Sequence, residues 1–358
     1  MNKRQIIGLM SGTSMDGLDI ALVEFSTNET NHYQHRVIKT QSVQFSDELN
    51  AFFAETQQLS APSVFELDKK FGQFLADKVN EFIESNKLKK SDIDAIASHG
   101  QTLFHQPQSG YTVQVGCGQT IAFHTGLKVI NDFRTRDIIA GGQGAPLVPI
   151  GDFELFKDLA ESYINVGGFV NISFRDKNGS IRAFDICPGN LPLNKLVLSR
   201  GLKFDENGNI ARTGDINFFL LDLLNSLPYY SAAYPKSLGV EWLEEQFYPL
   251  LKFDKEIENN LRTVVEHIAI QIAAVLNAHS MKSTLISGGG ARNSFLIERI
   301  QNYYEGKIII PDDELIEFKE AIIFSFLGYL YLENKPNCLA EVTGASQSVR
   351  SGTLHLPN

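Results

Sequence analysis

The sequence predicts an α/β protein with two domains. Its 358 residues exceed the length at which one hydrophobic core usually keeps growing. Short apolar runs typical of strands alternate with longer runs of helical spacing. A pair of short strands joined by glycine-rich residues begins near residue 5 and again near residue 163. We therefore expect domains at 1–155 and 156–340, and a tail from about residue 340 that belongs to the second domain or returns to the first.

The composition limits the classes of protein to which the chain can belong. It is 43% hydrophobic and 21% charged, which is typical of a globular protein. The formal net charge of −10 argues against a nucleic-acid partner, because phosphate contacts need clustered Lys and Arg. Cys117, Cys187 and Cys338 are few and widely spaced, which favours a reducing compartment without a zinc site. Since no run of about 18 apolar residues occurs, we expect a cytoplasmic protein without a membrane partner.

The first half opens with a hairpin. Apolar runs at 6–10 and 20–25 flank a segment rich in Gly, Ser, Thr and Asp. A helix is expected over 64–86, where apolar residues share one face. The remaining expected elements are strands over 35–45, 93–97, 112–115 and 127–131.

The second half repeats this order. Runs at 163–166 and 170–174, joined by Gly167-Gly168, predict a second hairpin. The long helix over 257–279 carries an unbroken apolar stripe, which is typical of a core helix. The other expected elements are strands over 181–185 and 284–287 and helices over 215–225, 241–251, 294–303 and 317–333. Two βββαβα halves facing across an interdomain cleft are typical of the actin/hexokinase-like ATPase fold, which we predict here.

The tip of the first hairpin has the composition of a phosphate site. Glycines allow close backbone approach, hydroxyl groups add donors, and consecutive N–H groups form a concavity suited to an anion. The alternative is a plain surface hairpin. Asp16 and Asp19 are candidate ligands for a divalent metal. The candidate nucleotide-binding residues in this segment are Gly12, Thr13, Ser14, Met15, Asp16, Gly17, Leu18 and Asp19.

A glycine triplet follows the strand over 284–287. Gly288, Gly289 and Gly290 enter a helix, so that a purine or phosphate could approach the backbone; a plain tight turn is the alternative. Neither the P-loop motif nor a complete Gly-x-Gly-x-x-Gly occurs, which disfavours both of those nucleotide sites.

Polar residues follow three of the strands. Asp185 ends one strand, where it is either a general base or the cap of a turn. The charged segment 131–137 is either a salt-bridged surface loop or the wall of a polar substrate site, and the glycines at 141–144 favour the site. His99, beside Gln101, could hydrogen-bond a sugar. Glu320 is expected to be a solvated residue.

Seven segments together resemble the 1,6-anhydro-N-acetylmuramic acid kinases of bacterial cell-wall recycling. The resemblance extends over the chain from end to end. The matching segments are residues 8–19, 98–102, 132–137, 141–149, 165–173, 288–293 and 343–345.

This resemblance implies an unusual reaction. ATP, with Mg²⁺, phosphorylates O6 of the anhydro-sugar while water opens the 1,6-anhydro bridge, and N-acetylmuramic acid 6-phosphate results. Asp185 matches the family's base, and Glu320, Arg134 and Arg136 match the sugar site, to which we also assign His99 and Gln101. Further nucleotide-binding positions are Gly167, Gly168, Asn171, Gly189, Asn190, Gly288, Gly289, Gly290 and Asn293.

The chain departs from the family pattern beside the expected base. Ile186-Cys187 replaces a usual Thr-Gly, and Asn194 replaces a usual aspartate. Two alternatives stay open, a kinase for another anhydro-sugar such as levoglucosan and a non-catalytic nucleotide or sugar sensor of the same fold, and the Ile186-Cys187 departure motivates the second. Cys187 is expected to be a buried filler. A homodimer is an expectation from the family.

Overall fold

The chain folds into two compact units. The structure, a computed structural model, describes residues 3–11, 17–29, 32–54, 59–234 and 236–357. The first unit comprises residues 1–156 and 318–358, and the second comprises residues 157–317. The expected boundary was between 155 and 156, and the chain returns to the first unit at 318, within helix α11 (Asp313–Leu332).

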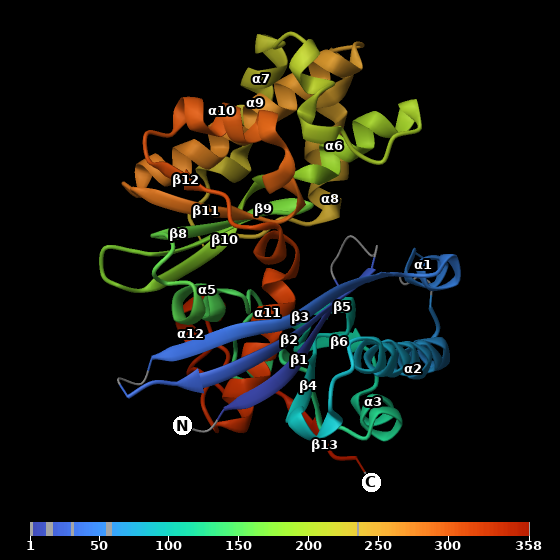
Figure 1. The fold of residues 1–358 in the computed structure, drawn as a ribbon. Coiled ribbons are helices and arrows are strands. Elements are labelled where there is room, and N and C mark those ends of the chain that lie inside the picture. The colour runs from blue at the N-terminus through green and yellow to red at the C-terminus, as the bar shows by residue number, and fades with distance from the viewer. Residues whose placement is uncertain (1–2, 12–16, 30–31, 55–58, 235, 358) are drawn as a thin grey trace. The chain divides into compact units, whose positions relative to one another are not determined.

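The first unit is built on a six-stranded sheet (Figure 1). Its strand order is β13-β7-β4-β1-β2-β3, in which β1, β2 and β3 are antiparallel and β4 and β7 run parallel to β1. The strands are β1 (Arg4–Ser11), β2 (Gly17–Thr27), β3 (Tyr33–Gln44), β4 (Ala95–Ser98), β7 (Val129–Asn131) and β13 (Thr353–His355), and a separate pair is β5 (Gln101–Gln106) and β6 (Tyr111–Val115). The helices are α1 (Asp47–Ala54), α2 (Ala61–Ser85), α3 (Gly118–Thr125), α4 (Thr135–Ile139), α5 (Pro149–Leu155) and α12 (Ala340–Thr343), with most of α11.

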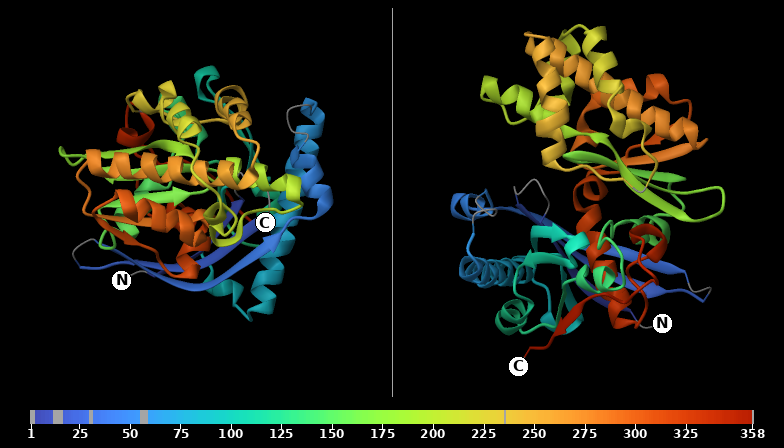
Figure 2. Two further views of the ribbon diagram at one scale, coloured as in Figure 1. Left: turned by 90° about the horizontal axis from the view of Figure 1, so that it is seen from above. Right: turned by 180° about the vertical axis from the view of Figure 1, so that it is seen from behind.

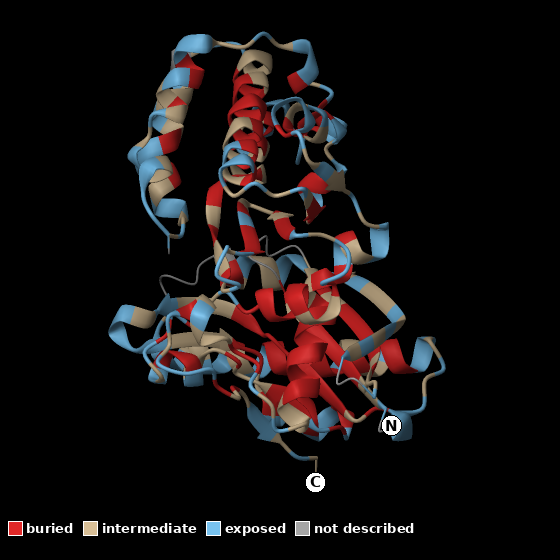
Figure 3. Ribbon diagram, turned by 90° about the vertical axis from the view of Figure 1, so that its left-hand side faces the viewer, coloured by how far each residue is buried: buried red, intermediate tan, exposed pale blue. Residues whose placement is uncertain are grey.

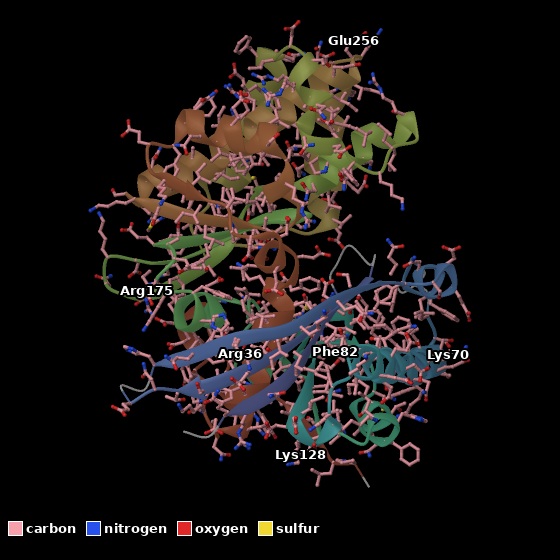
Figure 4. The ribbon with its side chains drawn as sticks, viewed as in Figure 1. Arg36, Lys70, Phe82, Lys128, Arg175 and Glu256 are labelled. Atoms are coloured by element: carbon pink, nitrogen blue, oxygen red, sulfur yellow. The ribbon has the colours of Figure 1, made fainter. Side chains whose placement is uncertain are left out.

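Successive residues of β1 lie on opposite faces of this sheet. Ile7 and Leu9 pack into a core with the apolar face of α2 and with α3. Gly8 lies against α11, where a Cβ would collide with the carbonyl oxygen of Ala321. In Figure 4, Phe82 of α2 lies toward the sheet and Lys70 lies on the outer side of that helix. The sheet is therefore covered by α2 and α3 on one face and by α11 on the other.

The second unit repeats the topology of the first. Its sheet has the order β10-β9-β8-β11-β12, with β8, β9 and β10 antiparallel and β11 and β12 parallel to β8. The strands are β8 (Ser162–Val166), β9 (Phe169–Arg175), β10 (Ile181–Pro188), β11 (Ser283–Ser287) and β12 (Lys307–Ile309). The α-helices are α6 (Asn190–Val197), α7 (Phe218–Asn225), α8 (Val240–Trp242), α9 (Ile257–Ala278) and α10 (Ser294–Tyr303). This duplication confirms the predicted βββαβα halves.

Helices α6, α7, α9 and α10 cover one face of the second sheet (Figure 2). Helix α9 is the centre of this core, as its stripe predicted, and buried residues fill the interior of each unit in Figure 3. By length and composition α9 would also pass for a membrane span, but 61% of that window is buried inside the protein. The core helices of globular proteins pass the same test.

The predicted helix over 241–251 is wrong in form. The segment divides into α8, a π-helical turn at Leu243–Phe247 and a 3₁₀ segment at Tyr248–Phe253. Pro249 cannot donate the hydrogen bond that an α-helix needs at this position, so the helix ends before it.

Candidate functional site

The predicted nucleotide-binding segments of the second unit meet at one edge of its sheet. Strands β8, β10 and β11 run in the same direction, so their carboxyl ends lie at the same edge. There the N–H of Gly189 donates to the carbonyl of Gly168 (2.8 Å), and the N–H of Asn190 donates to that of Gly167 (2.9 Å). The backbone of Gly288 approaches β8 so closely that a Cβ would collide with the side chain of Asn165.

Two kinds of glycine occur at this edge. Gly189, Gly288 and Gly290 are required by the protein itself, because a Cβ would collide with neighbouring atoms, and Gly288 also has a φ of +80°. At Gly167 and Gly289 a Cβ would meet nothing closer than 3.6 and 3.7 Å, respectively. The protein leaves space at these two positions, which fits the close approach of a ligand.

Two asparagines complete this group of predicted residues. Asn171 is exposed on β9, in register with both Asn165 and Asp185 on the flanking strands. The side chain of Asn293 accepts a hydrogen bond from the N–H of Leu296 (3.0 Å) and so caps α10. Asn171 is therefore available at the surface, and Asn293 has a structural role already.

The tip of the first hairpin is described only in part. Gly12, Thr13, Ser14, Met15 and Asp16 lie outside the described residues. The flanking residues Gly17, Leu18 and Asp19 begin β2.

Of these three, Leu18 is buried in the core of the first unit, so only its main chain could serve a ligand. Asp19 is half-buried and accepts a hydrogen bond from the hydroxyl of Ser42. Among the described residues no group of three His, Cys, Asp or Glu side chains gathers into a metal site. Asp19 is the described candidate ligand for Mg²⁺.

Asp185 has an unusual environment. It does not end its strand, as the sequence suggested; β10 continues to Pro188 through a bulge between Asp185 and Cys187. Its Oδ2 accepts a hydrogen bond from the N–H of Leu238 (2.8 Å), whereas no described residue bonds to Oδ1. Burial raises the pKa of Asp185 from 3.8 to about 6, although the N–H of Leu238 opposes the shift. Cys187 is fully buried, as expected.

Three predicted sugar residues gather in the first unit. His99 directly follows β4, and its Nε2 accepts hydrogen bonds from the Arg134 guanidinium, with 3.2 Å to Nε and 2.9 Å to an Nη. Burial and the charge of Arg134 lower the pKa of His99 to about 3, so the ring is neutral and its proton is assigned to Nδ1. Arg134 also donates to the carbonyl of Gly144 (2.6 Å) and interacts electrostatically with Glu320. Glu320 is half-buried, not solvated as its position alone suggested, and burial raises its pKa.

Polar atoms without partners lie beside this group. The atoms Ser98 Oγ, His99 Nδ1 and Gln101 Oε1 are buried and have no hydrogen-bond partner among the described residues. Buried polar atoms are normally paired, so three within four residues indicate a place for a polar ligand. Ser98 was not predicted as a site residue. The sequence Ser-His-Gly-Gln, which places polar side chains close to the histidine on both sides, was the signal that could have identified it.

Arg136 is placed apart from this group. It is exposed and donates to the carbonyl of Arg350 (2.9 Å). Asp137, the next residue, is fully buried and accepts hydrogen bonds from Gly144 (2.8 Å) and Thr343 (2.7 Å). The charged segment 131–137 therefore contributes one arginine to the polar group and a buried link between the glycine loop and the C-terminal tail.

A buried ion pair next to Glu320 was not predicted. Lys319 Nζ lies 3.1 Å from Asp152 Oδ1, and each side chain is only 4% exposed. The two residues are 167 positions apart in the chain, and no local pattern signals such a contact. Both charges act on Glu320, whose pKa Lys319 lowers and Asp152 raises.

The family model for anhydro-N-acetylmuramic acid kinase matches residues 4–357. The anhydro-N-acetylmuramic acid kinases of Shewanella denitrificans and Legionella pneumophila are 38% and 34% identical to the chain, covering 97% and 98% of it and 96% and 97% of those proteins. Among solved structures, the activator of the 2-hydroxyisocaproyl-CoA dehydratase from Clostridium difficile with bound ADPNP is 12% identical, with a TM-score of 0.44 over 92% of this chain and 97% of that one.

Proposed function

Since the chain belongs to the anhydro-N-acetylmuramic acid kinase family, we propose that Asp185 is the general base of its reaction. The enzyme is a kinase of cell-wall recycling that acts on anhydro-N-acetylmuramic acid. Its reaction couples hydrolysis of the 1,6-anhydro bond to phosphorylation of O6. A water molecule must lose a proton as it attacks C1, and a carboxylate is suited to accept that proton.

The environment of the Asp185 carboxyl carries this proposal. One oxygen is fixed by Leu238, and the other is left for a water molecule. A pKa of about 6 means that the group is ionised at neutral pH and still basic enough to accept a proton. Asp185 then takes the proton from water, the water oxygen bonds to C1, and the bond from C1 to O6 breaks. The freed O6 bonds to the γ-phosphorus of ATP, and ADP leaves.

We propose that the polar group of the first unit binds the sugar. His99 Nδ1–H is an unpaired donor, and Gln101 Oε1 is an unpaired acceptor, which suits the hydroxyl and amide groups of an amino sugar. Arg134 and Glu320 add opposite charges beside them. An arginine is suited to the lactyl carboxylate of the substrate, because a guanidinium can bind a carboxylate with two hydrogen bonds.

The glycine-lined edge of the second unit is our candidate for the ATP site. The space left at Gly167 and Gly289 supports this assignment. We propose that Asp19, with Asp16, holds Mg²⁺, which usually takes one or two carboxylates and completes its shell with phosphate oxygens and water. When bound, the ion would neutralise charge on the transferred phosphoryl group.

The test is sugar-dependent release of ADP by Asp185→Asn. We expect a loss of at least about 100-fold in kcat, a typical contribution of a general base. Asp176→Asn is the matched control, because Asp176 lies in the same β-hairpin, before β10 begins, and pairs with Arg182 (2.7 Å). Activity of Asp185→Asn equal to that of the control would refute the assignment of the base.

Specificity and assembly need separate measurements. Comparing anhydro-N-acetylmuramic acid with levoglucosan distinguishes the family substrate from the alternative sugar. The homodimer and the cytoplasmic location stay predictions, and sedimentation equilibrium of the full chain tests the first of them.

A further inference from the structure

Asp185 lies on an edge strand of its sheet, next to an interruption. Strand β10 has β9 on one side only. Asp185 is opposite Asn171 of β9, but the next pair joins Cys187 to Val170, so Ile186 is an extra residue in β10. A bulge of this kind loosens the ladder locally and is common beside active sites, where it directs a side chain. The sheet therefore flanks the Asp185 main chain on one side only.

A segment of the same unit holds the other side. The N–H of Asp185 donates to the carbonyl of Lys236 (3.2 Å), and the carbonyl of Asp185 accepts the hydroxyl of Tyr229 (2.6 Å). The N–H of Leu238 donates to Oδ2 (2.8 Å). We call residues 229–234 and 236–238 the strap. Three atoms of Asp185 are thus fixed by the strap.

The strap is also closed upon itself. Lys236 Nζ donates to the carbonyl of Tyr229 (3.0 Å) and lies 4.6 Å from the centre of the Tyr229 ring. It also lies 5.7 Å from the ring of Phe184, the residue before Asp185. The Tyr229 ring packs on Trp242, with 5.5 Å between ring centres. Tyr229 and Lys236, near the two ends of the strap, therefore bond to each other, and each also bonds to the main chain of Asp185.

From these contacts we infer that the strap orients the Asp185 carboxylate toward its water, with Tyr229 and Lys236 as the positioning residues. The inference rests on the proposed role of Asp185. Neither side chain bonds to the Asp185 carboxylate; both act through the position and the burial of the base. Misplacement of a catalytic group by a fraction of an ångström lowers the rate without abolishing binding.

The strap also explains the titration of the base. Burial is the main reason that the pKa of Asp185 is raised, and the strap covers this residue. The other titratable groups nearby are Lys236, Tyr229 and the buried thiol of Cys187. Loosening the strap would admit water to the carboxylate and lower its pKa.

The test compares two adjacent tyrosines in one element. Tyr229→Phe removes the hydroxyl that holds Asp185 and keeps the ring. Tyr230→Phe is the matched control, because the Tyr230 hydroxyl bonds His267 (2.8 Å) and not the base. For Tyr229→Phe we expect kcat to fall about fivefold to tenfold, KM for the sugar to stay within about twofold, and the acid limb of the kcat profile to move to lower pH.

Substitutions of Lys236 test the strap without changing Tyr229. Lys236→Met removes the bond that closes the strap and should move the acid limb in the same direction, whereas Lys236→Arg, which keeps a donor and a charge, should retain most of the activity. If Tyr229→Phe and Lys236→Met both match Tyr230→Phe in kcat and in pH profile, the strap does not position the base. Failure of the proposed base itself would instead appear as an active Asp185→Asn enzyme with an intact acid limb.

Discussion

Replacing Asp185 with asparagine should make the second unit more stable at neutral pH while it removes the activity. Burial raises the pKa of this carboxyl to about 6, so the folded chain binds the proton more tightly than the unfolded chain does. The favourable contribution of the protonated group is complete below the unfolded pKa of 3.8 and is lost as the pH rises through about 6. Above that pH the fold carries a partly buried carboxylate whose ionisation is unfavourable. Asparagine has the same shape, can keep the bond from Leu238 and never ionises.

The size of this effect follows from the two pKa values. Each tenfold change in proton affinity corresponds to about 1.4 kcal/mol, so pKa values of 3.8 and about 6 give roughly 3 kcal/mol as an upper bound. Since Asp185 is only partly buried, we expect about 1–3 kcal/mol of added stability at pH 8 and no difference between the two proteins near pH 3.5.

The chain provides a local probe for this measurement. Its one tryptophan, Trp242, lies in the second unit and packs against Tyr229 of the strap. Urea unfolding followed by its fluorescence at several pH values gives the free energy of unfolding for that unit. A difference between wild type and Asp185→Asn that does not change with pH would refute the argument, because it would show that ionisation of this carboxyl is not opposed by the fold.

Two further predictions concern packing. Asp152→Asn leaves the buried ammonium of Lys319 without its counter-charge and should lower the free energy of unfolding by about 3–5 kcal/mol, and a loss below about 1 kcal/mol would contradict the ion pair. Gly290→Ala should cost about 1–3 kcal/mol, because the new Cβ collides with Val166. The neighbouring substitution Gly289→Ala should leave stability within about 0.5 kcal/mol and raise KM for ATP, so equal effects on stability at the two glycines would show that the distinction between them is wrong.

Local patterns were sufficient for most of the fold. Strands with small, polar turns mark both hairpins, and these turns occur at the same point of each half. The predicted start of α10 at residue 294 is correct, and the side chain of Asn293 caps the helix there by accepting an early N–H. The segment 241–251 does not form the single helix that was predicted, because Pro249 interrupts it.

Contacts between residues far apart in the sequence could not be predicted from local patterns. Asp185 was identifiable from its position near the end of an apolar strand, but Tyr229 and Leu238, which hold it, are 44 and 53 residues away. The raised pKa of Glu320 likewise follows from burial against residues of other elements, and helical spacing around residue 320 does not reveal it. Sequence patterns indicate which side chains can do chemistry, whereas the surroundings that tune them come from tertiary packing.

The return of the chain at 318 has a consequence for synthesis. The first 156 residues leave the ribosome without α11, so the face of β1 that carries Gly8 stays uncovered until α11 has been made. The whole second unit, residues 157–317, is translated during this interval and has its own sheet and core. Domains generally fold as units in the order of their synthesis. Here that order is inverted, since the unit that starts first can be completed only after the inserted one.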